Sequence, residues 1–159
     1  MRSNTGQLTW NYAGKGYFTV NTPGTQAVVG FAQGMKLDLA DVTLQTNTPF
    51  VSLFVTSLDP QKPIAQASSL LITAVARARN TCMQYNANDT QVLNVGHAPI
   101  LMESVDATIT VRGRGQAKVQ ALDHSGHLTA TAVPVQTQGQ GATFHIGGDY
   151  RTLYYEVTF

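Results

Sequence analysis

Apolar and polar residues alternate along most of the chain, and this alternation favours β-strands. The longest apolar run, residues 68–80 (SSLLITAVARARN), decides the fold class. Read with a period of two, it has one apolar face and one face that becomes cationic at Arg77 and Arg79, as in a long strand that leaves the core. The apolar face consists of Leu70, Ile72, Ala74, Ala76 and Ala78. A helix is the alternative, because alanine, leucine and arginine favour helices and Ser68 or Ser69 is able to cap one.

The segments around this run favour the strand. Three short alternating runs, 8–12, 17–21 and 25–31, are separated by turns and predict a β-meander, in which Gly30 marks a bulge or a close approach of two backbones. Residues 50–58 are largely apolar on both faces, which indicates a central strand. With the later runs, the pattern predicts an all-β fold: a two-sheet antiparallel β-sandwich, jelly-roll-like, with little or no helix.

The middle of the chain is more polar than its surroundings. Residues 80–89 contain four Asn or Asp residues and are predicted to form a loop that carries Tyr85. Residues 91–95 are predicted to form a short edge strand. A single β-sandwich domain is expected to span residues 1–159.

Composition narrows the possible functions. The chain is 43% hydrophobic but only 12% charged, with a net charge of +1, so neither a nucleic-acid stripe nor a membrane-binding basic patch is expected. The single cysteine, Cys82, excludes an internal disulfide. A neutral, threonine-rich surface suits a secreted or cell-surface β protein better than a cytosolic helical one. The first residues, MRSNTGQ, lack the apolar region of a signal peptide, which predicts a module excised from a larger protein.

Several runs of the chain resemble one family. Residues 16–31, 71–81, 121–126 (ALDHSG) and 149–156 (DYRTLYYE) resemble segments of the C-terminal β-sandwich accessory module of large bacterial glycoside hydrolases. The resemblance implies a strand at 68–80. It also implies a carbohydrate-binding-like module that partners the catalytic domain of the same parent chain in a secreted or periplasmic polysaccharide-degrading enzyme.

The chain departs from the family pattern at two positions. Tyr154 stands where tryptophan is usual in the closing strand. Cys82 stands where the pattern has glycine, and a positive φ at this position would strain a cysteine.

The acidic residues do not predict a catalytic site. A glycosidase needs two carboxylates at a fixed separation. Glu103 and Asp106 are the nearest approach to such a pair, but residues three apart on a regular strand point to opposite faces. We therefore expect no catalytic residues and no enzymatic activity in this chain.

Sugar binding depends on aromatic rings that stack on the C–H faces of pyranoses and on polar groups that pair with hydroxyls. Trp10 and Tyr12 share a face with Leu8 and are assigned to the core or an interface. The other rings assigned to the core are Phe18, Phe50 or Phe54, Tyr155 and Phe159. The predicted carbohydrate-binding residues, chosen from polar strand faces and loops, are Tyr85, Tyr17, Tyr150, Tyr154, Arg79 and Asn86.

A structural calcium ion is possible, because sandwich modules often hold one through loop carboxylates. The predicted ligands are Asp38, Asp41 and Asp89, and no other cofactor is expected. The first functional hypothesis is a non-catalytic module that binds a polysaccharide or oligosaccharide. The alternative is a structural module that braces the catalytic domain or an oligomer interface without binding sugar.

Overall fold

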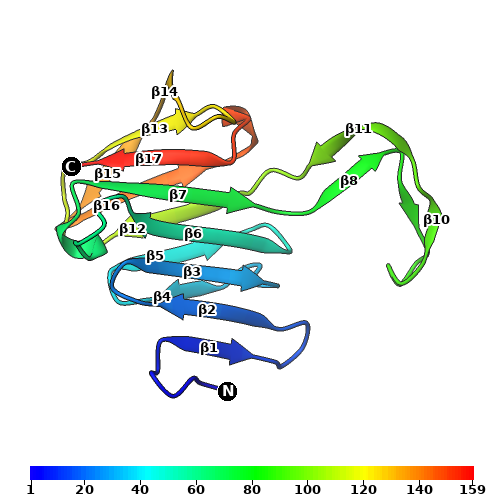
Figure 1. The fold of residues 1–159 in the computed structure, drawn as a ribbon, viewed down its shortest axis with the longest axis horizontal. Helices are drawn as coiled ribbons and strands as arrows, with labels where there is room; N and C mark the ends of the chain where they lie inside the picture. Colours follow the sequence, from blue (N-terminus) through cyan, green and yellow to red (C-terminus); the bar gives the residue numbers. More distant parts are fainter.

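The computed structural model describes residues 1–159, apart from the side chain of Gln138. The chain forms two antiparallel sheets that pack face to face around one apolar core, with a separate arm at one end (Figure 1). This arrangement confirms the predicted all-β sandwich. The helical content is limited to two short 3-10 turns, η1 at Ile64–Gln66 and η2 at Gly148–Tyr150.

The larger of the two sheets, here called the large sheet, faces the viewer in Figure 1. It contains the predicted N-terminal meander at one edge and the closing strand of the chain near its centre. Its strands, in spatial order, are β1 (Leu8–Asn11), β2 (Tyr17–Asn21), β3 (Thr25–Gly30), β6 (Val51–Ser57), β7 (Ser69–Val75), β17 (Tyr154–Thr158), β13 (Lys118–Leu122) and β14 (Leu128–Val133).

The second sheet, here called the small sheet, lies behind the large sheet in Figure 1. Its strands, in spatial order, are β15 (Val135–Gln138), β16 (Gly141–Ile146), β12 (Ala107–Val111), β5 (Val42–Thr46) and β4 (Lys36–Asp38). The core lies between the two sheets and includes Leu53, Ile72 and Phe144, each at most 2% exposed. Alternating burial along β6, β7 and β12 follows from this packing, because every second side chain points inward.

The alternating pattern correctly predicts a strand here, but the run 68–80 is not one strand: β7 covers residues 69–75 and β8 begins at Ala78. The strand β7 buries Leu70, Ile72 and Ala74, and the buried face continues to Ala76. The regular strand ends at Val75, and the chain then leaves the sandwich. The expectation that Ala78 belongs to the buried face is wrong, since Ala78 is exposed in a new strand outside the core.

The part of the chain that leaves the sandwich, residues 78–102, is called the arm. It consists of two short ribbons that follow one another outward, and it projects away from both sheets (Figure 1). The expected short strand at 91–95 is present, but the loop expected at 80–89 is partly strand. The arm strands are β8 (Ala78–Thr81), β9 (Gln84–Tyr85), β10 (Val92–Asn94) and β11 (His97–Met102).

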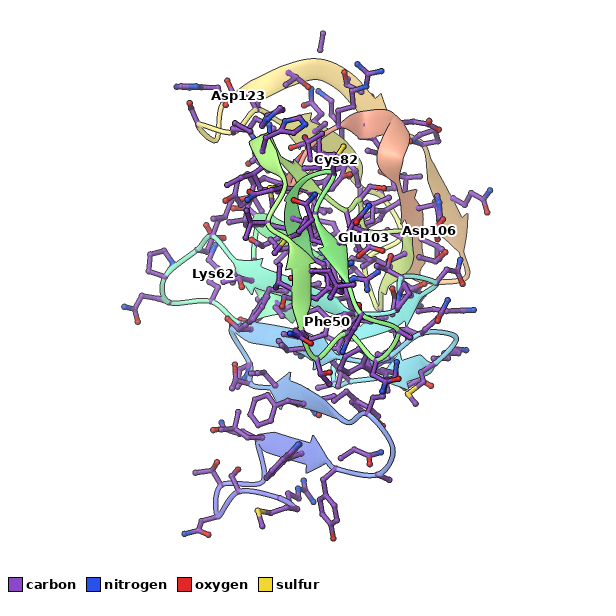
Figure 2. All side chains as sticks on the ribbon, turned by 90° about the vertical axis from the view of Figure 1, so that its right-hand side faces the viewer. Phe50, Lys62, Cys82, Glu103, Asp106 and Asp123 are labelled. Atoms are coloured by element: carbon purple, nitrogen blue, oxygen red, sulfur yellow. The ribbon has the colours of Figure 1, made fainter. Side chains whose placement is uncertain are left out.

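Figure 2 views the molecule with the arm toward the reader, with Glu103 at its base and Cys82 on the arm itself. Cys82 has φ 59° and is exposed. Its backbone is therefore in the left-handed region that a cysteine adopts at a cost. The sequence predicts strain at Cys82 if its φ is positive, and φ is positive in the structure.

In the meander, the side chains of the second strand that point toward the core are not the ones expected. The pattern assigns Phe18 to the core, but Tyr17 and Thr19 point inward and Phe18 is half-buried on the opposite face. Tyr17 pairs with Gly30, which has φ 125°. A Cβ at Gly30 would lie 2.7 Å from the Cα of Tyr17, so this crossing needs glycine. The predicted close approach of backbones at Gly30 is thus confirmed.

Candidate functional site

The outer surface of the large sheet carries aromatic side chains. Leu53 and Val55 of β6 are fully buried between the sheets, so Phe54 between them points outward. The same alternation turns three further rings onto this surface from β1, β2 and β17. We call this surface the aromatic face, defined by Trp10, Phe18, Phe54 and Tyr154.

The register of the strands arranges these rings across the sheet. Trp10 lies directly opposite Phe18 on the neighbouring strand. Phe54 lies opposite Thr73, and Thr73 lies opposite Tyr154. Neighbouring strands are about 4.8 Å apart, so the rings form a discontinuous track that runs across the strands.

Trp10 is the most accessible ring of the aromatic face, with 51% of its surface exposed. Tyr12, which is 70% exposed, packs edge-on against it with the ring centroids 6.0 Å apart. The assignment of Trp10 and Tyr12 to the core is therefore wrong, although an interface role stays open. Both residues do share a face with Leu8, but that face is the outer one, and Leu8 is itself 37% exposed.

A row of mostly polar side chains runs beside the aromatic face. Thr25 lies opposite Thr56, and the Thr25 hydroxyl donates a hydrogen bond of 3.3 Å to the Thr56 hydroxyl. The row continues through Leu71 to Glu156 and then Gln120. Phe54 and Tyr154 thus lie next to hydroxyl, carboxylate and amide groups that are able to pair with sugar hydroxyls. Trp10 and Phe18 lie one row further from these groups, in register with Ser52 of β6.

The structure separates the four tyrosines predicted to bind sugar. Tyr154 lies on the aromatic face. Tyr17 packs against the core, and Tyr85 lies on the arm. Tyr150 stands edge-on to Tyr155, with centroids 5.8 Å apart, and burial raises the pKa of Tyr155 to about 12. These tyrosines therefore do not form one site.

The arm does bring two of the predicted residues together. The guanidinium of Arg79 lies over the ring of Tyr85, 4.5 Å from its centroid, and Arg79 also lies 3.7 Å from the carboxylate of Asp89. Asn86 holds the turn at the tip, because its side-chain oxygen accepts the backbone N–H of Thr90 at 2.9 Å. One face of Tyr85 is thus occupied by a cation within the arm itself.

The predicted calcium ligands are not gathered around a common point. Asp38 accepts a hydrogen bond of 2.7 Å from Thr43 and lies 3.5 Å from Arg112. Asp41 accepts a hydrogen bond of 2.6 Å from the Gln26 amide. Asp89 is on the arm. Among the side chains that the structure describes, no cluster of three or more His, Cys, Asp or Glu residues is able to hold a metal ion.

Glu103 and Asp106 have separate partners. Both carboxylate oxygens of Glu103 accept hydrogen bonds from Arg77, at 2.7 and 3.0 Å. These bonds lower the pKa of Glu103 and raise the pKa of Arg77. Asp106 accepts a hydrogen bond of 2.7 Å from Asn47 and lies 3.9 Å from His145. Glu103 therefore closes the base of the arm, and Asp106 supports a loop of the small sheet.

Two further acids stabilise turns. Asp59 accepts hydrogen bonds from the backbone N–H and the hydroxyl of Ser68, and these bonds lower its pKa. Asp123 accepts the backbone N–H groups of His127 and Ser125, which lowers its pKa in the same way. Hydrogen bonding to a carboxylate favours its ionised form, so both acids have structural roles at exposed turns.

A concave corner of about 500 Å³ lies where the arm meets the sandwich. The arm contributes Ile100, Leu101 and Met102 to its wall, and the sandwich contributes His124 and Arg151 among others. No Trp, Tyr or Phe ring lines this corner. Its apolar wall therefore suits contact with another polypeptide better than contact with a sugar.

The aromatic face could have been found in part from the sequence. The runs at 8–12 and 17–21 are separated by the Gly14 and Gly16 turn, which predicts a hairpin that pairs Trp10 with Phe18. An aromatic pair of this kind lies on one face. The sequence does not say which face is covered, because this depends on the second sheet.

Comparison of the chain with protein-family models, with curated proteins and with solved structures found no match. No helix in the described chain has the length and apolar character needed to cross a membrane.

Proposed function

We propose that this chain is a non-catalytic carbohydrate-binding module whose binding surface is the aromatic face. The observation that carries the proposal is the set of outward-facing rings, with Trp10 and Phe18 in one row and Phe54 and Tyr154 in the next, and a row of hydroxyl, amide and carboxylate groups beside Phe54 and Tyr154. An extended polysaccharide that crosses the strands is able to contact rings and polar groups together. The module then belongs to a secreted or periplasmic polysaccharide-degrading enzyme, in which it raises the concentration of substrate near a tethered catalytic domain.

The ligand class follows from the polarity of the surface. The aromatic face and the polar row together carry one carboxylate, Glu156, and otherwise neutral groups. A neutral or weakly charged polysaccharide suits such a surface better than a strongly anionic one, because Glu156 repels sulfate and carboxylate groups.

Affinity electrophoresis against plant and algal polysaccharides tests the proposal. We expect at least one polymer to retard the wild-type chain, and Trp10→Ala to weaken binding about tenfold through loss of ring stacking. Tyr85→Ala, in the arm, is the matched control and is expected to bind as the wild type does. Because Trp10 is the only tryptophan, its fluorescence gives a second measure of binding. Unretarded migration on every polymer contradicts the proposal.

A second candidate is a structural module that braces a catalytic domain or an oligomer interface. The observation that favours it is the apolar surface of the arm, where the exposed residues include Val92, Leu93, Val95, Ile100, Leu101 and Met102. A photo-reactive label on Cys82, the only cysteine, tests this candidate in the parent enzyme. Adducts with a catalytic domain support bracing, and their absence contradicts bracing of that domain.

A further inference from the structure

The strand β11 has a free edge. All six of its residues are exposed, and it pairs on one side only, with β8 (Figure 1). Its apolar side chains are among the most accessible of the chain, with Ile100 66%, Leu101 55% and Met102 45% exposed. Exposed apolar edge strands readily pair with a further strand.

The hydrogen-bond pattern shows which backbone groups point to the free edge. The N–H of Glu103 donates to the carbonyl of Arg77 at 2.9 Å, and Met102 lies opposite Ala78 in register. Hydrogen-bonded and non-hydrogen-bonded pairs alternate along an antiparallel ladder. Met102 and Ile100 therefore occupy the non-hydrogen-bonded positions toward β8, and their N–H and C=O groups point away from it.

The proline of this strand does not block that edge. The Thr81 hydroxyl donates to the carbonyl of Pro99 at 2.8 Å, so the backbone of Pro99 is directed toward β8. Proline has no N–H, and at Pro99 that group would have pointed toward β8, so its absence does not affect the free edge. The register between β11 and β8 shifts between His97 and Ile100, so the regular free edge begins at Ile100.

We propose that this edge pairs with the same edge of a second copy of the chain in a twofold-symmetric dimer. A twofold axis at Leu101 places Ile100 opposite Met102 of the second copy, and Met102 opposite Ile100 of the second copy. Both positions direct N–H and C=O groups outward, so each finds a hydrogen-bonded partner. The four arm strands β8, β11 and their symmetry equivalents then form one sheet.

A second copy fits the edge because the edge is self-complementary. It has one outward hydrogen-bonding position on each side of Leu101, and the two flanking side chains, Ile100 and Met102, are both apolar. No charged side chain stands between Pro99 and Met102, whereas exposed edges are commonly protected by one. The dimer brings three exposed apolar side chains of each copy into cross-strand contact, and it is independent of sugar binding on the aromatic face.

A site-directed cross-link tests the predicted register. Leu101→Cys, in a Cys82→Ser background, places two cysteines across the axis in a non-hydrogen-bonded pair, where the Cα atoms are about 4.5 Å apart and within disulfide range. We expect a disulfide-linked dimer on mild oxidation. Ile100→Cys in the same background is the matched control, because Ile100 faces Met102 of the second copy and not itself. Equal cross-linking of the two variants overturns the proposed register.

Sedimentation equilibrium tests the dimer itself. Met102→Pro removes the N–H that points to the free edge and leaves the bonds to β8 in place, and an edge strand tolerates proline. The twofold axis doubles this loss, so we expect the dissociation constant to rise about thirtyfold. Leu93→Lys, elsewhere on the arm, is expected to leave dimerisation unchanged. A wild-type chain that sediments as a monomer overturns the proposal and leaves the edge to a strand of another protein.

Discussion

The sandwich and the arm are both built from antiparallel strands, but only the sandwich has a second layer. In the sandwich, inward side chains such as Phe144 and Ile72 are almost fully buried between two sheets. In the arm, every residue from 78 to 102 is exposed or half-buried. Strand pairing alone gives marginal stability in water. The arm must therefore depend on polar contacts more than the sandwich does.

Those polar contacts are specific. The Asn80 side chain donates to the carbonyl of Val95 at 2.9 Å, and Gly96, with φ 68°, packs so closely that a Cβ there would clash with the carbonyl oxygen of Thr81. In both regions the alternating pattern determines which strands pair, whereas burial determines how much the paired strands stabilise the fold.

The largest expected difference between the two regions is in the cost of truncating an apolar side chain. Phe144→Ala is expected to lower the free energy of unfolding by about 3–5 kcal/mol, because it removes a buried ring between the sheets. Leu93→Ala in the arm is expected to change it by less than about 0.5 kcal/mol. Urea denaturation of both variants measures this. Similar losses at the two positions would mean that the arm has a core of its own.

A second difference concerns glycine. Gly96→Ala is expected to open the arm, because the new Cβ would clash with the backbone carbonyl oxygen of Thr81 and the backbone nitrogen of Met83. Hydrogen exchange of the arm amides should accelerate by at least about tenfold, which corresponds to about 1.4 kcal/mol, while the amides of β6 and β7 keep their protection. Gly14→Ala is the matched control, since Gly14 also has a positive φ but a Cβ at that position would meet no other part of the chain within 4 Å.

The base of the arm is expected to respond to pH. The Arg77 guanidinium lowers the pKa of Glu103 below its ordinary value of 4.5. The ion pair therefore contributes fully above that value, and its contribution is lost as the pH falls through the lowered pKa. Both partners are partly exposed, so we expect about 0.5–1 kcal/mol. We expect Glu103→Gln to accelerate hydrogen exchange of the backbone amide at position 103 near neutral pH but not in acid. An equal effect at both pH values argues against the ion pair.

The last expected effect is a gain in stability. Cys82 has φ 59°, and glycine adopts this conformation without the steric cost of a Cβ. We expect Cys82→Gly to stabilise the arm by about 1 kcal/mol, seen as slower exchange of the β8 and β11 amides. Cys82→Ala serves as the control, because it removes the thiol and keeps the Cβ. If Cys82→Ala stabilises the arm equally, the thiol rather than the backbone is responsible.

The sequence predicts most of the sandwich because alternation is a local property. The strand β7 follows from it, and the close approach at Gly30 follows from the presence of glycine within a strand pattern. The inward direction of Tyr17 and the outward direction of Trp10 do not. Both depend on which face of the meander the second sheet covers, and no residue within the meander records that choice.

The arm is less predictable from the sequence for a related reason. Residues 80–89 have the composition of a loop, and their pairing depends on contacts made after the chain has turned back, such as Asn80 with Val95. The predicted sugar-binding residues Arg79 and Tyr85 do meet there, but Tyr17 and Tyr150 lie elsewhere. Residue type suggests which side chains are able to bind sugar, whereas only the tertiary structure shows which of them share a surface.

The ion pair between Arg77 and Glu103 also bears on chain entropy. Because these residues lie opposite each other at the base of the arm, residues 78–102 are topologically an insertion between two adjacent points of the sandwich. Closing a loop of this length instead of a two-residue turn costs about 2 kcal/mol. A chain in which an Asn-Gly turn joins Arg77 to Glu103 should therefore fold into the sandwich alone, so that the arm is a separable element of the fold.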